Sequence, residues 1–274
     1  MARNEHVADG APVTARPESL GPRPSNSGLG DTWSGLREVP GDLGRDLRDG
    51  ASADRDGELP AHLGDRVPHN LADPLENAWI FSWAAWAIVH QPLDFFQANI
   101  FNPEPFTFAY TENMSGLSLV AAPIYWLTGN ALLQVNVATL LALASSGLGM
   151  YVLVKGATGR GVVAFVAGTA YTILPYRMGQ FAHPHMLVHL LPWIAAMLLS
   201  LSRDVRRWKV ITLGVLVAWQ FWSSLTGGLI SLLLVFGWGV WELLQRRRRA
   251  LPVLAWTAVA MALAGALTFP VVRP

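Results

Sequence analysis

Two kinds of ionisable side chain gather in two stretches of this sequence. Carboxylates recur between residues 73 and 112, and histidines cluster between residues 183 and 189. One arginine, Arg177, comes shortly before the histidine cluster. Acids, imidazoles and an arginine brought together could bind an anion, a metal ion or a sugar. The set comprises Asp73, Glu76, Asp94, Glu104, Glu112, His90, His183, His185 and His189, with Tyr110 and Tyr176 nearby in sequence.

Several of these residues also have a purely structural interpretation. Asp73 followed by Pro74 matches a helix start, with a capping acid and proline at the first helical position. His183 and His185 form a His-Pro-His turn and are candidate metal ligands with Asp73, but the spacing fixes no third ligand. Hydrogen bonding at the membrane interface is the alternative for the two histidines. Arg177 could bind phosphate, or it could extend to lipid headgroups.

The composition places these residues in a membrane protein. Hydrophobic residues make up 52% of the chain and charged residues 14%, whereas soluble domains carry roughly 25% charged residues. Residues 1–72 hold twelve acids and eight arginines, and residues 73–274 hold twelve basic residues and seven acids. The second part cannot cover a globule with polar groups, so lipid must cover it. Nothing resembles a nucleic-acid footprint, and the absence of cysteine excludes disulfides.

The predicted fold is all-α: a polytopic transmembrane helix bundle with a disordered polar tail and short interfacial helices. Residues 1–70 form the tail, because they lack a sustained apolar period. Residues 71–128 include two short apolar helices, at 78–90 and 115–128. Trp79, Trp83 and Trp86 share one helical face and suit the depth of the membrane interface. Residues 129–274 hold about six spans, at 131–154, 161–178, 186–202, 210–225, 229–244 and 251–272.

The charges of the loops predict an orientation for this bundle. If the first span runs outward to inward, ten of the twelve basic residues after residue 72 fall on the inner side, as the positive-inside rule requires. The carboxylates between residues 73 and 112, and the histidine cluster, then fall together on the outer side. Residues 71–128 are therefore expected to be extracytoplasmic. The inner residues are Lys155, Arg160, Arg203, Arg206, Arg207, Lys209 and the arginine run 246–249.

The order of these features resembles the polytopic glycosyltransferases of the C superfamily, which take sugars from polyprenyl-phosphate carriers. The resemblance covers about residues 71–274 and consists of an ordered set of short segments. They are Leu-Ala-Asp-Pro-Leu-Glu-Asn-Ala-Trp at 71–79, Ala-Asn-Ile-Phe-Asn-Pro at 98–103, Tyr-Thr-Glu at 110–112, Pro-Ile-Tyr-Trp-Leu-Thr-Gly-Asn at 123–130, Pro-Tyr-Arg-Met-Gly-Gln-Phe-Ala-His at 175–183 and Leu-Pro-Trp at 191–193.

The resemblance implies roles for particular residues. Asp73 matches the essential acid of the family's first extracytoplasmic loop, so it is expected to act as a general base or to bind a metal. Arg177 or a bound divalent cation would stabilise the departing lipid phosphate. Glu112 is the second catalytic candidate. His183, His185 and Tyr110 are the further binding candidates, and the partners would be membrane lipid and a lipid-linked sugar donor in a bacterial inner membrane.

The chain also departs from the family pattern at both ends. The family has a span before the residue that matches Asp73, and here a polar tail occupies that place. We therefore expect a fragment that lacks the first span and the C-terminal part. The alternatives to an enzyme are a transporter or lipid flippase and a non-catalytic scaffold. A transporter would place polar groups at mid-membrane on paired interrupted helices, whereas the spans here are almost free of charge.

Overall fold

The computed structural model describes residues 52–54, 59–68, 73–101, 103–246 and 250–272. Most of the predicted polar tail lies outside these ranges. Within it, β1 (Ser52–Asp54) and β2 (Arg66–Pro68) pair in parallel, with the short 3-10 helix η2 (Leu59–Ala61) between them. Residues 52–54 and 59–68 of the predicted tail thus have regular structure or defined turns. Asn130 and Asn136 hold the second of these ranges in place, because their side-chain amides donate to backbone carbonyls of residues 63, 64 and 66.

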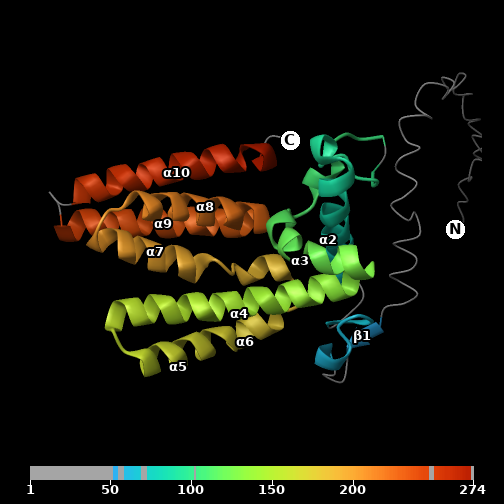
Figure 1. Cartoon of the computed structure of the whole chain (residues 1–274), viewed down its shortest axis with the longest axis horizontal. Helices are drawn as coiled ribbons and strands as arrows, with labels where there is room; N and C mark the ends of the chain where they lie inside the picture. The colour runs from blue at the N-terminus through green and yellow to red at the C-terminus, as the bar shows by residue number, and fades with distance from the viewer. Residues whose placement is uncertain (1–51, 55–58, 69–72, 102, 247–249, 273–274) are drawn as a thin grey trace, which may run out of the picture. The chain divides into compact units, whose positions relative to one another are not determined.

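The helices of the bundle follow one another back and forth with short turns between them (Figure 1). Four helical stretches of the described chain are long and apolar enough to cross a membrane: Ala131–Thr158, Pro184–Arg203, Leu225–Gln245 and Ala250–Phe269. The expected six spans thus become four by length and composition. The bundle helices are α4 (Ala131–Thr158), α5 (Gly161–Thr172), α6 (Pro175–Gly179), α7 (Leu191–Arg203), α8 (Arg207–Ser223), α9 (Leu225–Arg246) and α10 (Ala250–Val272), with η5 (Pro184–Leu187) preceding α7.

The predicted spans at 161–178 and 210–225 are the two that fall short. The first divides into α5, of 12 residues, and α6, of five. The break has a local cause, because Leu174 precedes Pro175 and takes an extended conformation with ψ of 133°. A residue before proline is driven out of the helical region by the proline ring. The second is α8, which has 17 residues.

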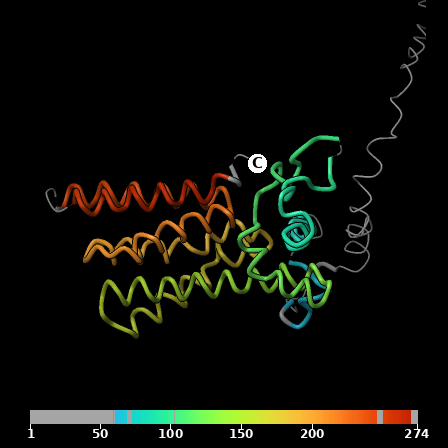
Figure 2. The backbone as a smooth tube through the Cα atoms, turned by 45° about the horizontal axis from the view of Figure 1, so that its top comes forward, coloured from blue at the N-terminus to red at the C-terminus, as the bar shows by residue number. Residues whose placement is uncertain are grey.

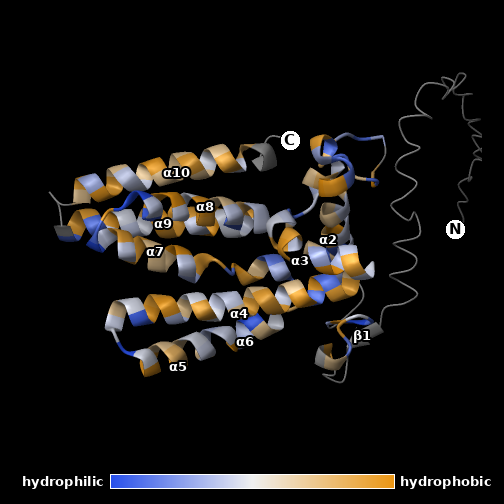
Figure 3. Cartoon of the chain, in the orientation of Figure 1, coloured by the Kyte–Doolittle hydropathy of each residue, from blue (hydrophilic) through white to orange (hydrophobic). Residues whose placement is uncertain are grey.

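The apolar flanks of these helices require lipid. Of the most apolar stretch of α10, 28% is buried inside the chain, and the same holds for α9. Val162 and Phe165 on α5 are 80% and 67% exposed. Figure 3 shows hydrophobic residues along the full lengths of the bundle helices. Soluble proteins rarely expose continuous apolar surface on this scale, so the chain is an integral membrane protein.

The helix α2 (Asp73–His90) lies across one end of the bundle rather than along it. Figure 1 shows its axis crossing the direction of the bundle helices, and Figure 2 shows it nearly end-on while they run lengthwise. The second short helix, α3 (Ser115–Thr128), has the predicted bounds. The short 3-10 helices η3 (Pro92–Asp94) and η4 (Thr107–Tyr110) lie in the connection between α2 and α3.

The tryptophan face of α2 packs inward rather than toward lipid headgroups. Trp83 is 1% exposed, and its indole nitrogen donates to the carbonyl of Phe95 at 3.1 Å. The Trp79 and Trp83 rings stack at 6.2 Å, and both lie within 6.5 Å of the Phe108 ring. Helical spacing correctly placed the tryptophans on one face. That face covers the 91–110 connection, and this contact could not be predicted from α2 by itself.

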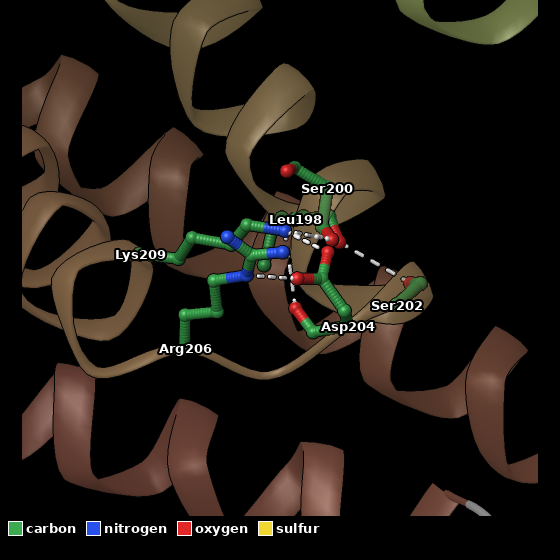
Figure 4. Close-up of polar contacts among 6 residues, drawn as sticks. All are labelled: Leu198, Ser200, Ser202, Asp204, Arg206 and Lys209. Atoms are coloured by element: carbon green, nitrogen blue, oxygen red, sulfur yellow. Dashed lines mark hydrogen bonds and ion pairs between the residues drawn. The ribbon is translucent and has the colours of Figure 1, made fainter.

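The other end of the bundle carries the basic turns. Asp204, between α7 and α8, accepts a hydrogen bond from Arg206 at 2.5 Å and another from Lys209 (Figure 4). Lys209 also donates to the carbonyls of Ser200 and Asp204 at 3.0 and 3.1 Å. The hydrogen bonds that the Asp204 carboxylate accepts from Lys209 and Arg206 hold its pKa below the usual range of a carboxyl. The turn is thus fastened by a charged network at the end of two helices.

Close glycine contacts hold α5 against α4, and this generates a prediction. A Cβ at Gly168 would lie 2.7 Å from the carbonyl oxygen of Gly147. Gly168→Ala should therefore lower the free energy of unfolding, by about 1–3 kcal/mol for an overpacked contact. The matched control is Gly156→Ala, because a Cβ there meets nothing within 4 Å. It should raise stability by roughly 0.5–1 kcal/mol.

Thermal or denaturant unfolding in detergent micelles, followed by circular dichroism, measures both variants. Equal effects of the two substitutions would contradict the close contact between α4 and α5.

Candidate functional site

Asp73 and His183 meet at the end of the bundle where α2 lies. Asp73 begins α2, and its Oδ2 atom is 2.8 Å from Nε2 of His183. The two residues are 110 positions apart in sequence. The Asp73 side chain is 59% exposed and that of His183 is 35% exposed, so a substrate could reach the pair. A carboxylate hydrogen-bonded to an imidazole can accept a proton while its orientation stays fixed.

The histidine turn is held in place by contacts from two other segments. Asn77 on α2 donates from its side-chain amide to the carbonyl of Ala182 at 2.8 Å, directly before His183. The rings of His183 and His185 lie perpendicular to each other with centroids 6.0 Å apart. The structure therefore brings three of the predicted residues together: Asp73, His183 and His185.

Arg177 holds together the segments that surround this cluster. The side chain is 4% exposed. Its Nη1 donates to the carbonyl of Leu187 at 2.7 Å and its Nη2 to the hydroxyl of Ser146 at 2.5 Å. The guanidinium also lies over the Tyr171 ring, 4.5 Å from the centroid. These contacts tie α4, α5, α6 and η5 together. Its predicted role in phosphate binding stays a prediction, because the contacts described here are with the protein.

Glu112 fastens the connection before α3 to the start of α9. Its Oε1 accepts from the hydroxyl of Ser224 at 2.8 Å and from the backbone N–H of Thr226 at 3.2 Å. Glu112 thus satisfies backbone and side-chain donors at a helix start, as a capping residue does. The sequence does not reveal this partner, because residues 112 and 224 are far apart in the chain.

Tyr110 is not brought into the cluster. Its side chain is 59% exposed, and its ring packs near Phe101 at 6.3 Å. Among the described residues it has no hydrogen bond to Asp73, His183 or Glu112. Its predicted role in substrate binding therefore stays a prediction without a contact to support it.

The expectation of a divalent cation receives no support from the geometry. Within the described residues, no group of three or more histidine, aspartate or glutamate side chains is arranged to hold a metal ion. Asp73 and His183 are joined by a hydrogen bond, and the ring of His185 packs against that of His183. The Nδ1 atoms of both histidines are buried without a hydrogen-bond partner.

Sequence reasoning missed the small polar residues that connect the site to the bundle. Gln220 on α8 is fully buried, and its Oε1 accepts from the backbone N–H of Leu190 at 3.0 Å. Asn77 and Ser146 are likewise buried and hydrogen-bonded to the histidine turn or to Arg177. The available signal for Gln220 was a single polar residue within an apolar run. Such a residue must find a partner inside the protein.

Comparisons of this chain with protein-family models, with curated proteins and with solved structures find no match.

The contacts of Glu112 give a prediction about stability. Glu112→Ala removes the acceptor of two hydrogen bonds and should lower the free energy of unfolding by about 1 kcal/mol, as for other capping residues. Glu112→Gln keeps a side-chain oxygen in place and should recover most of that loss. Thermal unfolding in detergent measures both. An unchanged unfolding temperature for Glu112→Ala would contradict the capping contact.

Proposed function

We propose that this chain is a membrane glycosyltransferase, or a fragment of one, that uses a polyprenyl-phosphate sugar donor. The observation that supports it most is the 2.8 Å contact between the exposed Asp73 and the partly exposed His183 at one end of the bundle. Asp73 is the residue whose position resembles the essential acid of the C superfamily. Its imidazole partner also comes from a segment that carries the resemblance.

In the proposed reaction, Asp73 takes the proton of an acceptor hydroxyl as that oxygen attacks the anomeric carbon of the donor sugar. The bond between this carbon and the phosphate oxygen breaks, and the lipid phosphate leaves with the bonding electron pair. His183 orients the Asp73 carboxylate through its Nε2 atom. A positioned base of this kind contributes roughly 10²–10⁴-fold to a rate.

The separation of charge in the structure supports an outer location for the site. Lys155, Arg203 and Arg206 lie at the bundle end opposite to α2, and residues 73–154 contain no lysine or arginine. With the basic end on the cytoplasmic side, residues 71–128 are extracytoplasmic. A lipid-linked donor carried on the outer leaflet would then reach Asp73. A bacterial inner membrane suits this arrangement.

A transporter is the second candidate, and one observation favours it. The interruption between α5 and α6 and the one between η5 and α7 lie on either side of Arg177, which is a buried cation. Interrupted helices of this kind hold substrate in many transporters. Movement of fluorescent lipid phosphates across proteoliposome membranes would distinguish it. Such movement without sugar transfer would replace the enzyme proposal.

Substitution of Asp73 tests the catalytic proposal. Asp73→Asn keeps the size of the side chain but removes the base, so sugar transfer should fall at least about 100-fold. The assay follows a radiolabelled pentose or hexose from a polyprenyl-phosphate donor into acceptor in isolated membranes. Asp94→Asn is the matched control, because Asp94 is an exposed acid of the same segment. Transfer that is equal in Asp73→Asn and wild type would remove Asp73 from the mechanism.

The absence of cysteine allows a direct test of orientation. Single cysteines at Thr111 and Gly179 lie at the α2 end, and one at Ala157 lies at the basic end. A membrane-impermeant thiol reagent applied to intact cells should label the first two and leave the third unlabelled. A cysteine at Ser52 reports the side of the tail. Labelling of Ala157→Cys alone would invert the orientation and exclude an outer-face donor.

A further inference from the structure

The turn between α4 and α5 has an open surface that the proposed function does not use. The glycines of this region, in the sequence Gly-Ala-Thr-Gly-Arg-Gly at 156–161, lie at the end of α4, in the connection and at the start of α5. No strand directly precedes them, so this is not a nucleotide-binding loop of the strand-turn-helix kind. A Cβ at Gly156 or Gly161 would meet nothing within 4 Å. By contrast, a Cβ at Gly147 or Gly168 would clash with the neighbouring helix. The glycines of the turn are therefore not required for helix packing.

Three arginines lie in or next to the α4–α5 and α7–α8 connections. Arg203, at the end of α7, donates from Nη2 to the carbonyl of Gly156 at 2.5 Å. This bond links the α7–α8 turn to the α4–α5 turn. Arg160 directly precedes α5, and Arg207 is the first residue of α8. All three arginines are exposed.

The pairing of charges within this end of the bundle is uneven. Asp204 is bonded to Arg206 and Lys209, as Figure 4 shows. Among the described residues, neither Arg160 nor Arg207 has a carboxylate within ion-pair distance. Arg160 and Arg207 are thus exposed cations that carboxylates of the described chain do not neutralise.

The position of these arginines at the ends of apolar helices indicates what they bind. The spans Ala131–Thr158 and Pro184–Arg203 both end there, so the three arginines follow directly after apolar helices. Trp208, beside Arg207, is 54% exposed, and tryptophan is enriched where membrane meets water. Basic residues directly next to the end of a span meet the headgroups of anionic lipids.

We propose that Arg160, Arg203 and Arg207, at the adjoining ends of α5, α7 and α8, bind phosphate headgroups of anionic phospholipids. The charge of the ligand complements the three guanidinium groups, which are well suited to phosphate oxygens. Its acyl chains would lie along the exposed apolar side of α5. This site lies at the opposite end of the bundle from Asp73, and the proposal does not depend on sugar transfer.

The test measures lipid affinity with the full purified chain in detergent. Phosphatidylglycerol is titrated in mixed micelles, with phosphatidylcholine as the neutral comparison, and binding is followed by thermal unfolding and by mass spectrometry of retained lipid. Wild type should prefer phosphatidylglycerol. The triple variant Arg160→Gln, Arg203→Gln, Arg207→Gln should bind it roughly 100-fold less tightly, about fivefold for each arginine. Arg66→Gln, at the other end of the bundle, should bind like wild type.

A second variant keeps the test decisive if the triple variant does not fold. Ala157 is exposed in the same turn, so Ala157→Glu introduces a carboxylate without disturbing a core, and it should lower the affinity about fivefold or more. Wild-type affinity in both variants would overturn the proposal. It would indicate that the lipid binds at the arginine run 246–249 instead. Equal stabilisation by inorganic phosphate alone would replace the lipid with a free anion.

Discussion

Arg177 provides the interaction on which the histidine turn depends. A buried guanidinium is expensive unless hydrogen bonds and an aromatic face compensate for its lost hydration. Here the compensation comes from the carbonyl of Leu187, the hydroxyl of Ser146 and the ring of Tyr171. These partners lie on separate segments, so satisfying one charge fixes several backbone elements at once. His183 can meet Asp73 because the turn that carries it is anchored on both sides, by Arg177 and by Asn77.

The surrounding lipid explains why the chemistry is confined to the two ends of the bundle. Along the flanks, each exposed polar group would lose its hydrogen bonds to water, so the helices present valine, leucine and phenylalanine there. Charged residues remain where water and headgroups are available. At one end, Asp73 of α2 pairs with His183, which precedes η5, and Glu112 accepts hydrogen bonds at the start of α9. The other end has arginines, of which some pair with Asp204 and others stay exposed to headgroups.

The sequence predicted which residues belong to the candidate site better than it predicted what each of them does. Asp73, Glu112, His183 and His185 were selected as ionisable residues of one face, and His183 contacts both Asp73 and His185. The contacts changed the interpretation of others. Arg177 is engaged by protein groups, and Glu112 fastens α9. Neither partner could be read from the sequence, because Ser146 and Ser224 are ordinary small polar residues in apolar runs whose neighbours depend on helix packing. Whether Asp73 acts as a base stays a prediction.

The sequence by itself determined the all-α membrane class, the bounds of α3 and the separation of acidic from basic turns. Hydropathy and charge are properties of local segments, so they can be read from the sequence without knowledge of the fold. The tertiary structure decided that α2 lies across the bundle with its tryptophans turned inward. It also decided that residues 63–66 bind Asn130 and Asn136, and that Asp73 meets His183. These contacts join residues separated by 66 to 110 positions, and such pairings follow from how the helices pack, which no local pattern encodes.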